Sequence, residues 1–204
     1  GVRLESFART AVPPSGRFEV LFAGAVGLRK GIPYLLESFA RLRHPAKRLR
    51  IAGMIHPDLK PILRSLPQDG VELLGPVTQP RLAELLATSQ LRVLPSIEEG
   101  LALVQGQALA CGCPVLCTTN TGGEDLFTDG IEGFIVPIRD APALTEKMQL
   151  LADDPALQAT MSQAALDRVH TLGGWGDYGN RWETLLRRLI ANGNPGPGAP
   201  PPTK

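Results

Sequence analysis

The chain reads Phe18-Glu19-Val20-Leu21-Phe22-Ala23-Gly24-Ala25-Val26-Gly27-Leu28-Arg29-Lys30-Gly31 near its amino terminus, and this stretch sets the pattern for the fold. An apolar run of strand length ends at a glycine, and a loop with two adjacent cations follows. Apolar residues then recur at the three- and four-residue spacing of a helix, at Leu35, Leu36, Phe39 and Leu42. The stretch therefore predicts a buried strand, a loop and an amphipathic helix, in that order.

The same unit recurs along the chain. Further strands are predicted at about 49–52, 71–74, 91–94, 114–117 and 133–136, and shorter helices at 57–65, 79–88, 102–110 and 124–129. Three longer helices follow, at about 141–152, 155–170 and 175–191. Strands that alternate with helices are typical of a doubly wound sheet. We predict an α/β, Rossmann-like fold with a six-stranded parallel sheet and helices on both faces, and a ligand site beyond the carboxyl ends of the strands.

The ends of the chain differ from this central part. Residues 1–17 are interpreted as the remnant of a linker between domains, and residues 18–191 as one domain. Residues 192–204 hold five prolines and three glycines, so this tail is expected to be disordered. Because the chain opens on Gly1 and not on Met, we expect it to be part of a longer protein.

Composition limits the classes of function. The net charge of +1 gives no reason to expect nucleic acid as a partner, and no apolar run approaches the length that spans a bilayer. There is no secretory signal, so a cytoplasmic location is expected. The three clustered cysteines show no metal-ligand spacing with the histidines, and are predicted to be buried free thiols: Cys111, Cys113 and Cys117.

The loop after the first strand is a candidate anion site. Arg29 and Lys30 stand directly before a helix start, where free backbone N–H groups and the helix dipole attract negative charge. A diphosphate would suit this place, with Gly24 at the strand end. The alternative is that both cations are solvated loop charges. The loop matches neither the dinucleotide-binding glycine pattern nor the P-loop.

A second candidate constellation follows the fourth predicted strand. Glu99 lies in the loop and Gln107 lies eight residues later, about 12 Å apart if the segment is helical throughout. Both could face one ligand along the helix start, with the N–H groups of Leu101, Ala102 and Leu103 free to meet a phosphate. The alternative is that Glu99 only complements the helix dipole.

These motifs together resemble the retaining glycosyltransferases of family 4, also called glycosyl transferases group 1, which have the two-domain GT-B fold. The usual signature of that family is P-S-x-x-E-G-F-G-L-V-x-x-E-A-M-A-C-G-x-P-V. The segments that carry the resemblance follow in the family's order: Gly1 to Phe7, Arg29-Lys30-Gly31 with Leu35-Leu36, Gly75-Pro76-Val77, Pro95 to Gly100, and Ala108 to Val115. The resemblance implies that this chain is the carboxyl-terminal, donor-binding half of a GT-B enzyme.

The resemblance also implies roles for individual residues. Lys30, helped by Arg29, would contact the donor diphosphate, and Glu99 would bind hydroxyls of the donor sugar. Gln107 stands where the family has the glutamate that binds ribose, and Val77 would meet the base. Gly100 and the N–H groups that follow it would hold a phosphate. The expected reaction is glycosyl transfer with retention and without metal.

Partners and substrates follow from the same resemblance. The expected substrate is a nucleoside-diphosphate sugar, with UDP or GDP as the nucleotide, and no cofactor is expected. The half that would hold the acceptor is absent, so the chain is expected to be inactive alone. Any association with a membrane surface is expected through that absent half only.

Two departures from the family pattern keep other functions open. The place of the family's arginine after the first strand is taken by Ala25, and Gln107 replaces a glutamate. The alternatives are a non-catalytic nucleotide-sugar-binding or scaffolding module, and a relative of sugar-nucleotide epimerases. In the last predicted helix, Trp175, Tyr178 and Trp182 are interpreted either as core residues or as a surface between the two domains of a GT-B enzyme.

Overall fold

The computed structural model describes residues 6–172 and 175–191. Its centre is one six-stranded sheet in which every neighbouring pair of strands is parallel, in the order β3-β2-β1-β4-β5-β6. The strands are β1 (Phe18–Ala23), β2 (Lys47–Ala52), β3 (Val71–Gly75), β4 (Leu91–Leu94), β5 (Val115–Thr118) and β6 (Gly133–Val136). The predicted six-stranded parallel sheet is confirmed.

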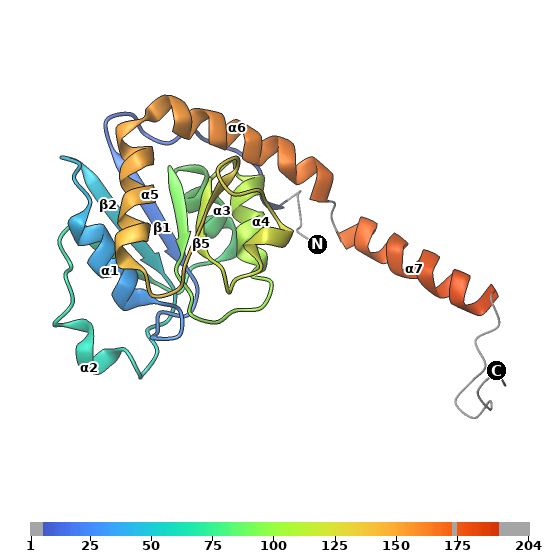
Figure 1. Ribbon diagram of the computed structural model, residues 1–204, viewed down its shortest axis with the longest axis horizontal. Helices are drawn as coiled ribbons and strands as arrows, with labels where there is room; N and C mark the ends of the chain where they lie inside the picture. Colours follow the sequence, from blue (N-terminus) through green and yellow to red (C-terminus); the bar gives the residue numbers. More distant parts are fainter. Residues whose placement is uncertain (1–5, 173–174, 192–204) are drawn as a thin grey trace.

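Helices cover both faces of the sheet (Figure 1). Helices α1 (Ile32–Arg41) and α5 (Ala141–Asp153) pack together on one face, and α3 (Gln79–Ala87) and α4 (Leu103–Ala110) pack together on the other. Helix α6 (Pro155–Leu172) runs from α5 to α4 along the edge of the domain. The Rossmann-like arrangement predicted from the alternation of elements is therefore confirmed.

The central strands owe their position to their sequence. Strands β1, β4 and β5 are buried at every position, as expected for parallel strands with helices on both faces. The outer strand β3 carries no fully buried residue. The most apolar segments of the chain therefore lie in the middle of the sheet.

Two predicted helices are shorter in the structure. The helix predicted at 57–65 is reduced to α2 (Lys60–Leu63), because the residues before it form turns in which Asp58 pairs with His56 at 3.0 Å. The helix predicted at 124–129 is only the 3-10 turn η2 (Gly123–Asp125), after which Phe127 is buried in the core. In the first place the loop contact precedes a helix that starts late, and in the second the helical turn ends before Phe127.

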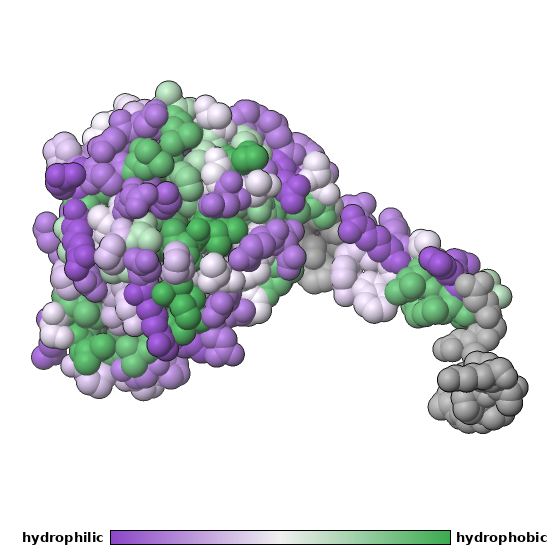
Figure 2. All heavy atoms as spheres, in the orientation of Figure 1, coloured by the Kyte–Doolittle hydropathy of each residue, from purple (hydrophilic) through white to green (hydrophobic). Residues whose placement is uncertain are grey.

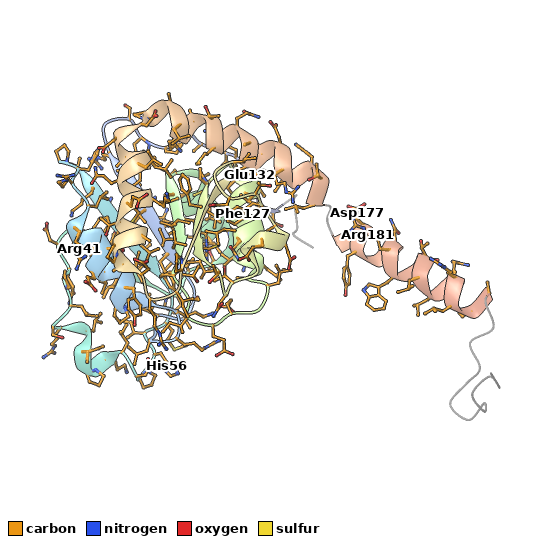
Figure 3. The ribbon with its side chains drawn as sticks, viewed as in Figure 1. Arg41, His56, Phe127, Glu132, Asp177 and Arg181 are labelled. Atoms are coloured by element: carbon orange, nitrogen blue, oxygen red, sulfur yellow. The ribbon has the colours of Figure 1, made fainter. Side chains whose placement is uncertain are left out.

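Helix α7 (Trp175–Ala191) projects away from the sheet domain (Figure 1). Its apolar residues form a stripe at helical spacing, and each is close to half exposed or more: Tyr178, Trp182, Leu185, Leu186 and Leu189. Apolar and hydrophilic side chains lie next to each other on this helix in Figure 2, and Figure 3 shows Asp177 and Arg181 in its first turns. The interpretation of Tyr178 and Trp182 as core residues is therefore wrong, because each side chain is about half exposed. The Trp175 side chain lies outside the described residues.

The segment before β1 lies against the domain. Phe7 is buried in the core, and the Gln90 side-chain amide donates hydrogen bonds to the carbonyl groups of Pro14 and Arg17. The predicted disordered tail, residues 192–204, lies outside the described residues. Within the described ranges no helix combines the length and the apolar character needed to cross a membrane.

Candidate functional site: a cleft between β1 and β4

The strand order places a crevice between β1 and β4. The chain leaves β1 toward one side of the sheet, through β2 and β3, and resumes in β4 on the other side of β1. In doubly wound sheets the crevice beyond such a reversal is where ligands bind, because the two following loops part there. The loop after β1 carries Lys30, and the loop after β4 carries Glu99.

The two loops are fixed to each other by backbone contacts. The N–H group of Ile97 donates to the carbonyl oxygen of Arg29 at 2.9 Å, and Arg29 Nη1 donates to the carbonyl oxygen of Glu98 at 3.4 Å. Gly31 has a φ of +70°, and a Cβ atom at this position would collide with the Pro95 carbonyl group. Glycine therefore allows the start of α1 to approach the end of β4 this closely.

Lys30 and Glu99 meet across the crevice. Their side chains form an ion pair, with relative exposures of only 14% and 19%. Partial burial lowers the pKa of Lys30 below its ordinary value, and the positive charges of Arg29 and Arg92 lower this pKa further. Lys30 is thus the lysine of the crevice, with Arg29 and Arg92 nearby, and Glu99 is the acid that pairs with it.

The amino terminus of α4 opens into the same place. No side chain caps this helix, and the N–H groups of Leu101, Ala102 and Leu103 have no hydrogen-bond partner among the described residues. Free N–H groups at a helix start bind anions, because the helix dipole adds to their partial charge. The structure therefore has a helix start with free N–H groups at the predicted place, and anion binding there stays a prediction.

Two adjoining cavities lie along this edge of the sheet. The smaller, of about 310 Å³, is lined by Lys30, Glu99, Gly24 and the segment 101–104. The larger, of about 520 Å³, is lined mainly by apolar and small residues, with Val77 and Gln107 among them. Because Ala23, Gly24 and Val104 line both, the two cavities are neighbours and together could hold one elongated ligand.

Most predicted site residues therefore come together, and a few remain apart. Neither cavity is lined by Arg29 or Gly100; Arg29 instead holds the loop of Glu98. Sequence reasoning missed residues that shape the larger cavity from the loops after β2 and β3 and from the start of α3, and these are Gly53, Met54, Pro76 and Gln79. Their position directly after β2 and β3 was the signal that could have identified them.

The polar loop after β5 supports the site from one side. Asn120 donates from its amide group to the Ile97 carbonyl at 3.0 Å, and Gly122 packs closely against Leu101. Gln105, which is fully buried in α4, donates to the Thr121 carbonyl. This loop therefore holds the start of α4 in place, and it lines neither of the two cavities described above.

The cysteines line neither of the two cavities. Cys111, Cys113 and Cys117 are free and buried, as predicted. Burial raises the pKa of Cys111 to about 12 and that of Cys117 to about 11, so both are protonated thiols at neutral pH. Within the residues that the structure describes, no group of three or more His, Cys, Asp or Glu side chains could hold a metal ion.

The fold and the site together define a class of protein: a Rossmann-like domain of the GT-B type, with a cleft at the carboxyl ends of its strands. The sequence model of the family described as "Glycosyl transferases group 1" matches residues 17–154. The chain belongs to this family.

Known proteins agree with this assignment. A D-inositol 3-phosphate glycosyltransferase of Pseudarthrobacter chlorophenolicus is 34% identical over 169 residues, which are 78% of this chain and 40% of that protein. Sucrose-phosphate synthase of Thermosynechococcus elongatus matches the structure with a TM-score of 0.82 at 27% identity, over 94% of this chain and 52% of the synthase. The chain therefore spans about half the length of such relatives.

A solved carboxyl-terminal domain shows which half this is. That domain, from the group 1 glycosyltransferase LpcC of Francisella tularensis, matches with a TM-score of 0.76 at 18% identity. The match covers 84% of this chain and 97% of that domain. The chain has the fold of the carboxyl-terminal half of a group 1 glycosyltransferase.

Proposed function

We propose that this chain is the donor-binding half of a retaining glycosyltransferase, and that it binds a nucleoside-diphosphate sugar in the two adjoining cavities. The observation that carries the proposal is the neighbourhood of two unlike cavities. One holds a lysine and free helix N–H groups, and the other is mainly apolar. A diphosphate needs the first environment, and a nucleoside needs the second.

The diphosphate is assigned to the smaller cavity. Lys30 supplies a cation, and the N–H groups of Leu101, Ala102 and Leu103 supply hydrogen-bond donors. Hydrogen bonds between charged partners are roughly twice as strong as those between neutral ones. Gly24 lines both cavities and has no side chain, so the ligand backbone could pass close to the end of β1.

The two ends of the ligand are assigned by chemistry. Glu99 lines the smaller cavity and accepts hydrogen bonds only, so it suits the hydroxyl groups of the donor sugar. Gln107 can accept and donate, which suits the hydroxyl groups of a ribose. Val77 and Met54 would then lie beside the base.

The proposed reaction breaks the bond between the anomeric carbon and the diphosphate. The leaving diphosphate gains negative charge as this bond breaks, and Lys30 with the α4 amino terminus is positioned to stabilise it. Arg29 contributes positive charge to the same loop, one residue before Lys30. We further propose retention at the anomeric carbon and no bound metal, with the acceptor held by the other half of a GT-B enzyme.

Calorimetric titration of the chain with UDP, GDP and ADP tests this function. We expect one of them to bind, with an affinity that is the same in buffer containing EDTA and in buffer containing magnesium. Transfer should require the full-length protein, and the anomeric configuration of its product reports on retention. A folded chain that binds none of the three nucleotides would contradict the proposal.

A further inference from the structure

Arg92 is a charged side chain in the middle of the sheet. It lies in β4 beside β1, its relative exposure is 0%, and it is the largest fully buried side chain among the described residues. Arginine is almost never fully buried unless a partner compensates its charge. The burial of Arg92 therefore calls for an explanation.

The structure provides no compensating charge. Arg92 Nη2 donates to the carbonyl oxygen of Ala23 at 3.1 Å, while Nε and Nη1 have no hydrogen-bond partner, and no ion pair involves this residue in the described part of the chain. Burial lowers the pKa of Arg92 to about 10, so the guanidinium is still charged at neutral pH. The nearby Cys113 and Cys117 offer no negative charge, because burial raises the pKa of both thiols.

The side chain runs toward the candidate site. In the register of the sheet Arg92 lies opposite Leu21, yet its Nη2 atom reaches the carbonyl of Ala23, two residues further along β1. Ala23 lines both cavities, next to Gly24. The guanidinium, which has no ion-pair partner among the described residues, therefore hydrogen-bonds to the Ala23–Gly24 segment that lines the cleft, here called its floor.

The charge of Arg92 affects Lys30 in the smaller cavity. Arg92 is one of the cations that lower the pKa of Lys30, after burial and Arg29. Two cations that repel each other are both stabilised when an anion binds between or beside them. An anionic ligand in the smaller cavity would supply the counter-charge that the protein itself does not.

We propose that Arg92 is a positioning charge for the donor diphosphate, which raises the affinity of the cleft for anions from beneath the Ala23–Gly24 floor without touching the ligand. The inference rests on the proposed function, since it concerns the same cleft. It also implies a cost: an uncompensated buried charge destabilises the empty domain. Arg92 would thus lower the stability of the empty domain and raise its affinity for the diphosphate.

Arg92→Met is the variant that separates these two effects, because methionine keeps much of the length and removes the charge. We expect Arg92→Met to weaken binding of the nucleoside diphosphate about tenfold and that of the monophosphate less, and to change binding of the uncharged nucleoside less than about twofold. The same variant should raise the midpoint of thermal unfolding of the empty domain. Arg92→Lys, which retains a cation, should bind the diphosphate within about threefold of the original chain.

Arg50→Met is the matched control. Arg50 is an arginine of the same sheet, but Glu19 pairs with it at 3.3 Å, and Thr88 and Ser89 accept its hydrogen bonds. Its removal should lower the unfolding midpoint and leave the affinity for all three ligands unchanged. Opposite changes of the unfolding midpoint in Arg92→Met and Arg50→Met would distinguish the unpaired charge of Arg92 from the paired charge of Arg50.

The titrations use the nucleotide among UDP, GDP and ADP that the original chain binds best, with its monophosphate and nucleoside. Equal losses for diphosphate and nucleoside in Arg92→Met, or no loss at all, would overturn the inference and leave the proposed function intact. If Arg92→Met does not fold, the affinities of Arg92→Gln and Arg92→Lys provide the same comparison between a neutral and a charged side chain at this position. An original chain that binds no nucleotide would instead contradict the proposed function.

Discussion

Lys30 and Glu99 form an ion pair that spans the gap between the loops after β1 and β4. The pair joins the two halves of the sheet at the point where the strand order reverses. It also means that the main cation of the cleft is already neutralised in the empty domain. In the proposed function a diphosphate therefore competes with Glu99 for Lys30, and substitutions of the two residues should have different effects on ligands with and without a sugar.

Lys30→Met should weaken binding of the nucleoside diphosphate strongly. A hydrogen bond to a charged group contributes about 1.5–3 kcal/mol, so we expect a loss of about tenfold to 100-fold. The nucleoside alone should bind almost as before, since Lys30 lines the smaller cavity and the nucleoside is assigned to the larger one. Lys60→Met removes an exposed lysine at the start of α2 and serves as the control in calorimetry. Equal affinities of the Lys30 and Lys60 variants would argue against Lys30 as the diphosphate ligand.

The affinity for the diphosphate should fall with rising pH earlier than an ordinary lysine would cause. The charged form of Lys30 binds the anion, so the contribution is complete below its pKa and is lost as the pH rises through it. Burial and neighbouring cations lower this pKa from 10.5, which moves the loss to lower pH. Lys30→Arg keeps its charge as the pH is raised from neutrality toward the ordinary pKa of lysine. The ratio of the affinities of the original chain and of this variant over that range separates titration of Lys30 from titration of the ligand. A ratio that stays constant across this range would contradict the prediction.

Gly31→Ala should disrupt the contact between the two loops. Gly16 and Gly31 have similar positive φ angles, of +73° and +70°, but only Gly31 faces another backbone group. Gly16→Ala should lower the free energy of unfolding by about 1 kcal/mol, from the left-handed conformation alone. Gly31→Ala should cost about 1–3 kcal/mol more, because the Pro95 carbonyl must move. Urea unfolding followed by circular dichroism compares the two, and similar losses would show that the approach to Pro95 is unimportant.

The three cysteines should be unreactive in the folded domain. Thiolates are the reactive species, and burial raises the pKa of Cys111 and Cys117 to about 12 and about 11. At pH 8 a disulfide reagent should therefore label none of the three thiols within minutes, and all of them after unfolding in guanidinium. A thiol in the folded domain that reacts as fast as free cysteine would show that this part of the core opens.

The strands and the charged half of the site could be predicted from the sequence, because both depend on local patterns. The apolar run from Phe18 to Ala23 gave the bounds of β1, and the loop positions of Lys30 and Glu99 placed both at one edge of the sheet. The ion pair itself depends on strand order, which periodicity does not report. Arg92 was missed for a related reason, because a charged residue inside an apolar strand reveals its role only when its neighbours in the sheet are known.

Glu99→Gln should change the affinities for bare and sugar-bearing nucleotides in opposite directions. Glutamine cannot form the ion pair, so Lys30 is released for the diphosphate, and the bare nucleoside diphosphate should bind about threefold more tightly. If Glu99 accepts hydrogen bonds from the sugar, the nucleotide sugar loses bonds to a charged acceptor worth about 1.5–3 kcal/mol, more than the released lysine returns. Calorimetry with UDP and UDP-glucose, or with the matching pair for another base, measures both affinities.

Glu98→Gln is the control for this prediction. It removes the same charge one residue earlier, from an exposed position, and should alter neither affinity by more than about twofold. Tighter binding of both ligands to Glu99→Gln would show that Glu99 only restrains Lys30, whereas weaker binding of both would show that the ion pair is needed to shape the cleft.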